Sequence, residues 1–339
     1  MKNILVTGGA GFIGSHTVIE LVKNGLNPIL IDNFSNSEKF VLDNISKLCH
    51  QEIVCHEIDC TEQTAVDAVF EKHEIHGVIH FAAFKAVAES FKKALEYHKN
   101  NVNSMNVILE SMKKYKVKNL VFSSSCTVYG DPEEFPVMEN SKKNPPTSPY
   151  GASKVYCERI LSDVYSQENS ELNAIMLRYF NPIGAHPSAL LGELPLGSPN
   201  NLVPYITQTA AGVRKKLTIF GKDYDTPDGT CLRDYIHVVD VARAHVLALK
   251  WISIQEKNLS AINLGSGKGI SVLEVVRAFE KVSGLDLNYH FGERRVGDIA
   301  EVWADSSKAN SVLNWQPEFS LEDAMLHAWQ WEKKIREIS

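Results

Sequence analysis

The chain has 339 residues, of which 44% are hydrophobic and 22% are charged, as is usual for a soluble globular protein. This length allows a large buried core and two lobes in one compact body. The net charge of −6 gives no reason to expect nucleic acid or an anionic membrane as a partner, and no apolar stretch approaches the ~20 residues of a membrane-spanning helix.

The N-terminus predicts a strand, a glycine turn and a helix. Residues 3–7 form a short apolar run that is typical of a buried parallel strand. Gly8, Gly11 and Gly14 follow at the spacing G-x-x-G-x-x-G, and an amphipathic helix is predicted over residues 13–24. Glycines in such a turn let the backbone approach a pyrophosphate, which the N–H groups at the helix N-terminus then bind. The segment therefore predicts a dinucleotide site.

An acidic residue ends the next predicted strand, residues 28–32. Asp32 lies about 20 residues beyond the glycine turn, where a carboxylate holds the 2′-hydroxyl of the adenosine ribose. The same carboxylate would repel a 2′-phosphate, and residues 33–36 contain no arginine or lysine that could bind one. The sequence therefore favours NAD over NADP.

Strand and helix patterns alternate through the first two-thirds of the chain. Further strands are predicted at residues 53–58, 77–81, 118–123 and 174–179, and helices near 62–73, 95–115 and 150–167. This alternation predicts an α/β fold of the Rossmann type, a doubly wound parallel sheet with helices on both faces. Ligands bind at the carboxyl ends of such strands, so we expect one crevice lined by Thr7, Gly8, Asp32, Asp59, Phe81, Ala82 and residues 123–125.

Tyr150 and Lys154 lie four residues apart on a predicted helix and therefore share one helix face. A free tyrosine, with a pKa near ~10, is a poor base at neutral pH, but a nearby ammonium favours the phenolate and lowers that pKa. The pair predicts a base that removes a proton from a substrate hydroxyl. Isolated pairs at this spacing are common on solvent-exposed helix faces, and the glycine turn on the same predicted sheet is what favours the catalytic interpretation.

The six cysteines are scattered without a C-x-x-C pair, which predicts buried free thiols rather than a disulfide framework. The twelve histidines show no H-E-x-x-H or comparable spacing, so no metal site is expected. Because the first strand begins at residue 3, no signal peptide is expected, and we predict a reduced, cytoplasmic protein.

The pattern changes after Phe180. Residues 181–204 are rich in proline, glycine and asparagine and predict an ordered loop that covers a site. Short strands and helices follow. Ser271 begins a capping box for a helix that runs to about Gly284, and Ser320 begins a last amphipathic helix whose tryptophans we expect to pack.

Together these motifs resemble the extended short-chain dehydrogenase/reductase superfamily. Within it the chain is similar, over essentially its whole length, to the family of UDP-glucose 4-epimerases (UDP-galactose 4-epimerases). The matching segments are residues 6–16, 31–33, 80–82, 85–87, 100–103, 123–125, 128–130, 177–182, 184–187, 199–202 and 233–237, with Tyr150, Lys154, Arg295, Gly297 and Asp298. Most of the early segments are shared with sugar-nucleotide dehydratases and decarboxylases, whereas residues 184–187 and 233–237 point to the epimerases.

The resemblance implies that UDP-galactose and UDP-glucose are interconverted through a 4-keto sugar. Tyr150 takes the proton from the hexose 4-hydroxyl while the C4 hydride passes to NAD, and the flat keto sugar then turns and accepts the hydride on its other face. Ser125 would hydrogen-bond to O4 and share in the proton transfer. Lys154 would bind the nicotinamide ribose and, with the nicotinamide, hold down the pKa of Tyr150. NAD is returned unchanged and should stay bound as a prosthetic group.

By the same resemblance, residues 1–180 would form the NAD-binding domain, with a later segment near 236–265 returning to it, and residues 181–339 would form mainly a smaller UDP-sugar-binding α/β lobe. The cofactor would be bound by Gly8, Gly11, Phe12, Ile13, Gly14, Asp32, Asn33, Asn36, Ser37, Asp59, Cys60, Phe81, Ala82, Lys85, Asn100, Ser123, Tyr150, Lys154 and Phe180. The substrate would be bound by Lys85, Ser125, Tyr150, Asn181, Asn201, Leu202, Thr218, Ile219, Phe220, Arg233, Arg295, Asp298 and Val302. Arg233 and Arg295 suit the diphosphate because a guanidinium fork matches its oxygens, although either arginine alone would indicate a surface ion pair.

Other interpretations remain open. A 4,6-dehydratase or a decarboxylase of the superfamily would share the glycine turn and Tyr150 with Lys154. A dehydratase usually carries an Asp-Glu pair just after the fifth strand, where residues 124–128 hold no carboxylate. A non-catalytic NAD-sensing protein could keep the glycines and Asp32 but would not need Tyr150, Lys154 and Ser125 together.

Three positions depart from the commonest epimerase pattern. Ala83 and Cys126 are small replacements that we expect to affect only packing. Val302 stands where hexose-only enzymes carry a tyrosine beside the sugar C2 substituent, so we expect UDP-N-acetylglucosamine and UDP-N-acetylgalactosamine to be accepted as well. The resemblance also implies a homodimer formed through helices around residues 95–115 and 150–167.

Overall fold

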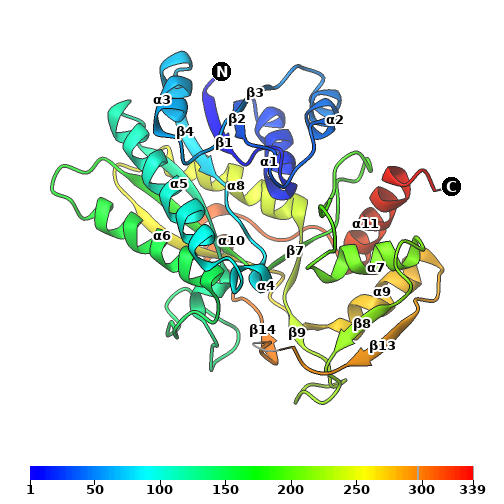
Figure 1. Cartoon of the computed structure of the whole chain (residues 1–339). Helices are drawn as coiled ribbons and strands as arrows, with labels where there is room; N and C mark the ends of the chain where they lie inside the picture. The colour runs from blue at the N-terminus through cyan, green and yellow to red at the C-terminus, as the bar shows by residue number, and fades with distance from the viewer. Residues whose placement is uncertain (296–297, 339) are drawn as a thin grey trace. The chain divides into compact units, whose positions relative to one another are not determined.

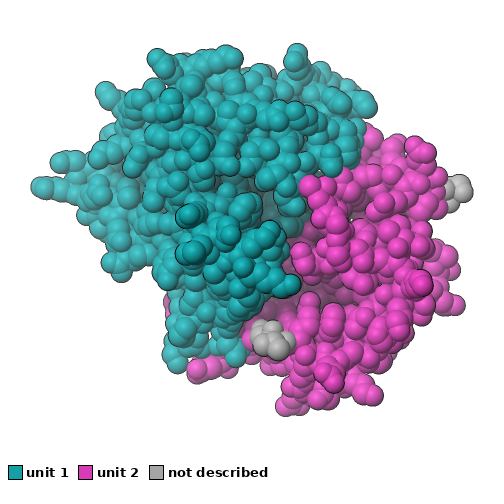
Figure 2. Space-filling model, viewed as in Figure 1, with its two compact units in different colours: residues 1–131, 142–179, 242–262 teal, residues 132–141, 180–241, 263–339 magenta. Residues whose placement is uncertain are grey.

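The computed structural model describes residues 1–295 and 298–338, which form two compact units (Figure 2). Unit 1 comprises residues 1–131, 142–179 and 242–262, and unit 2 comprises the remainder. The expected first domain, residues 1–180, is therefore interrupted, because residues 132–141 belong to unit 2. Val137 in that segment pairs with Ala304 of unit 2 by an isolated β-bridge.

A seven-stranded sheet forms the centre of unit 1 (Figure 1). Its strand order is β11-β6-β5-β4-β1-β2-β3. The strands are β1 (Asn3–Thr7), β2 (Asn27–Asp32), β3 (Val54–Glu57), β4 (Ile75–His80), β5 (Asn119–Ser125), β6 (Asn173–Tyr179) and β11 (Leu259–Leu264). Neighbours from β3 across to β6 pair in parallel. The chain moves outward in both directions from β1 and β4, which makes their carboxyl ends the topological switch point where ligands bind.

Helices cover this sheet as the alternating pattern predicts. They are α1 (Phe12–Lys23), α2 (Phe40–Cys49), α3 (Gln63–Lys72), α4 (Val87–Ser90), α5 (Ala94–Lys114), α6 (Pro149–Tyr165) and α8 (Val238–Ile252), with a short 3-10 helix η1 (Cys126–Tyr129). Figure 1 shows α3, α5 and α6 side by side, and their apolar side chains Phe70, Ile108 and Leu161 pack into one buried cluster with the sheet. All six strands predicted before residue 180 are present, whereas α2 and α4 were not predicted.

Unit 2 contains three small sheets. Strand β7 (Asn181–Ile183) pairs with β10 (Tyr235–His237), β8 (Leu217–Phe220) pairs with β13 (Tyr289–Gly292), and β9 (Leu232–Arg233) lies between β12 (Ile270–Ser271) and β14 (Glu301–Val302). The helices are α7 (Leu202–Ala210), α9 (Val272–Ser283), α10 (Ser307–Leu313) and α11 (Leu321–Ile335). The expected loop over residues 181–204 thus also holds β7 and the start of α7.

Capping explains where the later helices of unit 2 begin. Ser271 and Glu274 form the predicted capping box of α9, which ends at Gly284 in the left-handed conformation. Ser320 begins α11 with a second box. Trp329 and Trp331 on α11 are buried, as expected from the sequence. Among the described residues, no helix is both long enough and apolar enough to cross a membrane.

Candidate active site

The glycine turn between β1 and α1 has no room for side chains. Gly8 has a φ of +67°, and a Cβ there would lie 2.9 Å from the backbone nitrogen of Ala82. A Cβ on Gly14 would lie 2.2 Å from the carbonyl oxygen of Gly8. Gly11 is the N-cap of α1 and supplies no side-chain cap, so the N–H groups of the first turn remain available to an anion. These contacts fit a dinucleotide pyrophosphate.

The carboxylate of Asp32 is fixed beside this turn. Its Oδ2 accepts a hydrogen bond from the backbone N–H of Ala10 at 2.9 Å. Its Oδ1 accepts from the N–H of Phe34 at 2.9 Å and from the hydroxyl of Ser37 at 3.1 Å. Because these donors hold the carboxyl group in one orientation at the end of β2, Asp32 is well placed to accept a ribose hydroxyl.

A second carboxylate lies at the end of the neighbouring strand β3. Asn33 donates to Asp59 at 2.9 Å, and Thr61 donates to it through both its N–H and its hydroxyl. Burial by itself would raise the pKa of Asp59, but these hydrogen bonds outweigh it and hold the pKa below the usual value. Cys60 beside it is buried, and burial raises the pKa of its thiol. Asn33, Asp59 and Cys60 are all among the residues expected to bind the cofactor.

Helix α6 begins at the residues that carry the proposed chemistry. The hydroxyl of Ser148 accepts the N–H of Gly151 at 3.1 Å, and Pro149 occupies the first turn, where its missing N–H costs nothing. Tyr150 and Lys154 therefore lie on the first two turns, with one helix face in common.

Strand β5 ends beside the face of α6 that carries Tyr150 and Lys154. The Lys154 ammonium donates to the carbonyl oxygen of Ser123 at 2.6 Å and lies 6.0 Å from the centre of the Tyr150 ring. The Tyr150 hydroxyl shares a hydrogen bond with Ser125. The three residues predicted to carry catalysis are thus brought together with Ser123 at the carboxyl end of the sheet, where Ser123, Ser125 and Lys154 are buried and Tyr150 is half-buried.

Burial is the main influence on the pKa of Tyr150. Burial raises it to about 12, and the hydrogen bond from Ser125 offsets this only in part. Burial outweighs the Lys154 ammonium, which lies near the ring and donates to Ser123. That Lys154 and a bound nicotinamide together lower this pKa stays a prediction. Burial also lowers the pKa of Lys154 to about 8. A further positive charge beside Tyr150 would lower its pKa.

The other expected cofactor residues also lie in unit 1, except Phe180, which is buried in unit 2. Ala82 donates its N–H to the hydroxyl of Thr7 at 3.2 Å. The Lys85 ammonium lies 5.9 Å from the centre of the Phe12 ring, at the start of α1. Asn100 donates to Asn101 at 3.0 Å. Further placements are Phe81 packed on His245, Ile13 in α1, and Asn36 exposed in the loop after β2.

The two arginines expected at the diphosphate both donate to one carboxylate in unit 2. Asp298 accepts from Arg233 at 3.3 Å and from Arg295 at 2.8 Å. The Arg295 guanidinium also lies 5.0 Å from the centre of the Phe220 ring. Val302 is paired with Arg233 between β14 and β9 and is buried. Gly297, part of the family match, lies outside the described residues.

The remaining expected substrate residues are spread over three elements of unit 2. Asn181 begins β7, and its N–H donates to the carbonyl of Asp234 at 3.0 Å. Asn201 is the N-cap of α7 before Leu202 and donates to Glu193 at 2.6 Å. On β8, the Thr218 hydroxyl lies 3.4 Å from a ring nitrogen of His290. The next residue, Ile219, is buried in the hydrophobic core, so its side chain serves packing.

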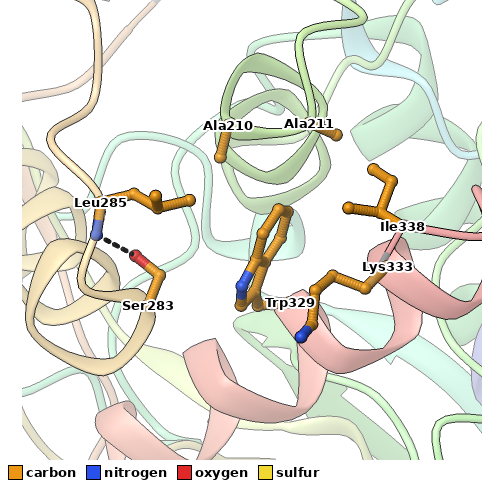
Figure 3. A pocket seen from close by; sticks show the side chains of 7 residues that line it. All are labelled: Ala210, Ala211, Ser283, Leu285, Trp329, Lys333 and Ile338. Carbon is orange, nitrogen blue, oxygen red and sulfur yellow. Dashed lines mark hydrogen bonds between the residues drawn. The ribbon is translucent and has the colours of Figure 1, made fainter.

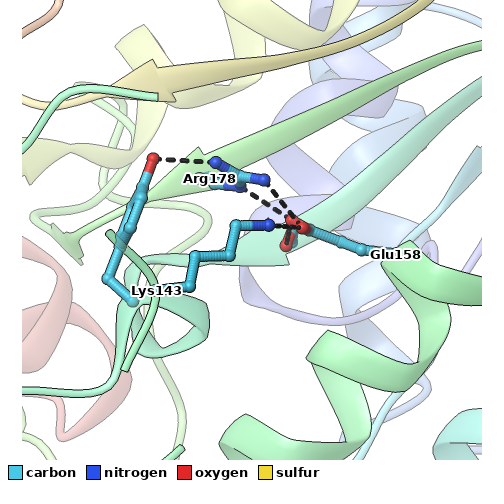
Figure 4. A network of polar contacts seen from close by, with 5 residues as sticks. Lys143, Glu158 and Arg178 are labelled. Atoms are coloured by element: carbon cyan, nitrogen blue, oxygen red, sulfur yellow. Dashed lines mark hydrogen bonds and ion pairs between the residues drawn. The ribbon is translucent and has the colours of Figure 1, made fainter. Parts of the chain in front are cut away.

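Three buried polar residues beside the end of β5 were not predicted. Tyr179 on β6 hydrogen-bonds to the hydroxyl of Ser123. Glu158 on α6 and Arg178 on β6 form a buried ion pair (Figure 4). Glu158 lies four residues beyond Lys154, so the helical spacing that joined Tyr150 to Lys154 could have indicated it.

Other candidate sites give a different picture. No group of three or more histidine, cysteine, aspartate or glutamate side chains in the described part of the chain could hold a metal ion. The six cysteines are free thiols. Unit 2 contains a pocket of about 400 Å³, and Figure 3 shows its lining side chains, with Trp329 between the others. The pocket is lined by Ala210, Ala211, Ser283, Leu285, Trp329, Lys333 and Ile338, none of which is an expected site residue.

Comparisons with known proteins point in one direction. Residues 4–265 match the model of the NAD dependent epimerase/dehydratase family. The chain is 48% identical over 329 residues to the UDP-glucose 4-epimerase of Dictyostelium discoideum, covering 97% of this chain and 95% of that one. The UDP-glucose 4-epimerase of Bacillus subtilis (strain 168) is also 48% identical over 329 residues, covering 97% and 96%. The crystal structure of UDP-glucose 4-epimerase from Bifidobacterium longum in complex with NAD+ and UDP is 44% identical, with a TM-score of 0.95 and full coverage of both chains.

Proposed function

Because this chain belongs to the NAD dependent epimerase/dehydratase family, we propose that it inverts C4 of UDP-hexoses and so interconverts UDP-galactose and UDP-glucose. The observation that carries this proposal is the meeting of Tyr150, Ser125 and Lys154 at the end of a sheet that also carries the glycine turn. A protein that only sensed NAD would not need that trio. The close similarity to curated epimerases favours epimerisation over dehydration or decarboxylation.

NAD is the cofactor. When bound, it would supply a reversible hydride acceptor for C4 of the sugar and, in its oxidised form, a positively charged nicotinamide ring. The open N–H groups of α1 and the tight glycine turn would bind its pyrophosphate, and Asp32 would bind the ribose. Asn33 and Asp59 would border the adenosine.

The chain's own residues move the proton and hold the substrate. Tyr150 as phenolate removes the proton from O4 and later returns it, and Ser125 hydrogen-bonds to that oxygen. Lys154, anchored to Ser123, adds a cation next to the phenol. Arg233 and Arg295 bind the diphosphate through their guanidinium forks, with Asp298 orienting both groups beforehand.

A direct assay tests the function. The purified protein should convert UDP-galactose to UDP-glucose with no reductant and no NAD added. Loss of UDP-galactose with accumulation of a stable 4-keto-6-deoxy sugar would indicate a dehydratase, and release of carbon dioxide from a UDP-uronic acid would indicate a decarboxylase.

The first prediction that follows is that the cofactor remains bound during purification. Denaturing the protein prepared without added NAD should release about one dinucleotide per chain as NAD or NADH, because a group returned unchanged has no need to dissociate. NADP should be absent, since Asp32 would repel its 2′-phosphate. Chromatography of the released nucleotides measures both. Protein that is empty, or that contains NADP, would contradict the prediction.

The second prediction concerns substrate range. We propose that Val302, which lacks an aromatic ring, leaves space beside the sugar C2 substituent, so that UDP-N-acetylglucosamine and UDP-N-acetylgalactosamine are also interconverted. Val302→Tyr should fill this space and lower kcat/KM for the N-acetylated pair by at least ~10-fold more than for the hexose pair. Val302→Ile is the matched control and should change both pairs alike. Equal effects of the tyrosine on both pairs, or no N-acetylated activity in the parent, would show that Val302 is not the gate.

We also propose a cytoplasmic homodimer formed through the helices around residues 95–115 and 150–167. The surface near these helices carries large exposed apolar side chains, a feature typical of interfaces. They are Val87, Phe91, Leu95 and Tyr156. Light scattering of the purified protein at several concentrations measures the mass of the species in solution, and a monomer at all concentrations would contradict the proposal.

A further inference from the structure

A buried carboxylate sits one turn beyond the catalytic lysine. Glu158 follows Tyr150 and Lys154 at intervals of four residues, so the three share one face of α6. Its oxygens accept four hydrogen bonds within unit 1. They come from the Ser124 hydroxyl at 2.7 Å, from Arg178 Nε at 2.8 Å and Nη2 at 2.7 Å, and from Lys143 at 2.9 Å (Figure 4). Four donors saturate a carboxylate, so its position is closely determined.

The partners of Glu158 come from different elements. Ser124 belongs to β5 and Arg178 to β6, and Arg178 also donates to the hydroxyl of Tyr129 in η1 at 2.9 Å. The pairing of Arg178 with Glu158 is bidentate, which fixes direction as well as distance. One side chain of α6 is therefore tied to two central strands and to the turn that follows β5.

Ser124, the residue of β5 that donates to Glu158, lies between Ser123 and Ser125 of the candidate active site. The carbonyl of Ser123 accepts the Lys154 ammonium, and Ser125 shares a hydrogen bond with Tyr150. A shift of α6 along β5 would lengthen both contacts together. Since a 1 Å misplacement of reacting groups can cost about 10²-fold in rate, the attachment of α6 to β5 has a direct bearing on proton transfer.

We propose that Glu158, acting through Ser124 and Arg178, is a positioning residue that sets Tyr150 and Lys154 against the serines at the end of β5. The expected effect on kcat rests on the proposed function. The geometric part, the placement of the Tyr150 hydroxyl on Ser125, holds whatever the substrate is.

Ser124→Ala tests the proposal, because it removes one hydrogen bond to Glu158 and leaves the ion pair with Arg178 in place. We expect kcat for UDP-galactose to fall about tenfold with KM unchanged, a part of the loss that a full misplacement would cause. Ser124→Thr keeps the hydroxyl and should restore kcat. The matched control is Ser111→Ala, since Ser111 is buried on α5 and donates to Asp67 at the same 2.7 Å. Ser111→Ala should lower Tm by about as much as Ser124→Ala does, but it should leave kcat unchanged.

A second readout needs no substrate. In protein labelled with carbon-13 at tyrosine Cζ, the signal lost in Tyr150→Phe identifies Tyr150, and its chemical shift reports the hydrogen bond with Ser125. This signal should move in Ser124→Ala and not in Ser111→Ala. If Ser124→Ala leaves both kcat and the Tyr150 signal unchanged, the network is only structural and the proposal is wrong. If the signal moves while the parent shows no epimerisation, the positioning role stands and the proposed function fails.

Discussion

Replacement of Tyr150 by phenylalanine is expected to lower kcat for UDP-galactose by about 10²–10⁴-fold, the usual cost of removing a positioned acid–base group. The ring remains, and the hydroxyl that is lost has Ser125 as its hydrogen-bond partner, so folding and the amount of bound NAD should be unchanged. Steady-state kinetics together with the dinucleotide content of the denatured protein measure the two effects separately.

Tyr156 provides the control for this experiment. It is a second tyrosine on α6, about half exposed and close to His98 rather than to the serines. Tyr156→Phe should therefore leave kcat within about twofold of the parent. Near-normal turnover in Tyr150→Phe would remove the basis of the proton-transfer mechanism. Loss of bound NAD in that variant would mean instead that the tyrosine mainly holds the cofactor.

Replacement of Glu158 by glutamine is expected to lower the free energy of unfolding by about 3–5 kcal/mol, because it leaves the buried Arg178 guanidinium without a counter-charge. Denaturant titration of parent and variant at neutral pH measures this difference. The exposed pair of Arg159 and Asp163 on the same helix is the control, since Asp163→Asn removes an ion pair that water can replace. A variant of Glu158 as stable as the parent would show that the network contributes little.

The effect of Glu158 should depend on pH in a defined direction. Burial alone would raise the pKa of Glu158, but Arg178 and Lys143 outweigh burial and hold it below its usual value of 4.5. A carboxyl group whose pKa is lower in the folded state stabilises the protein above its unfolded-state pKa. This stabilisation is lost as the pH falls through the folded-state pKa. The stability difference between the parent and Glu158→Gln should therefore be constant near neutral pH and shrink below pH 4.5.

Some features of the fold were visible in local patterns, and others were too weak to detect. Helix α2 buries only Val41 and Ile45, and α4 is a single turn, so neither has the repeated apolar spacing that predicts a helix. The boundary of unit 1 could not be predicted from local sequence patterns either. Residues 132–141 join unit 2 through pairing with residues far along the chain, which no local pattern reports.

The sequence by itself determined the Rossmann-type sheet, the glycine turn and the pairing of Tyr150 with Lys154, because strand, turn and helix periodicities are properties of neighbouring residues. The tertiary structure alone decided which distant side chains meet. Ser124 reaches Glu158 across 34 positions, and Arg233 reaches Asp298 across 65. It also decided that burial, rather than the neighbouring ammonium, dominates the pKa of Tyr150. Desolvation depends on everything packed around a group in three dimensions, and the spacing of two residues along a helix does not contain that information.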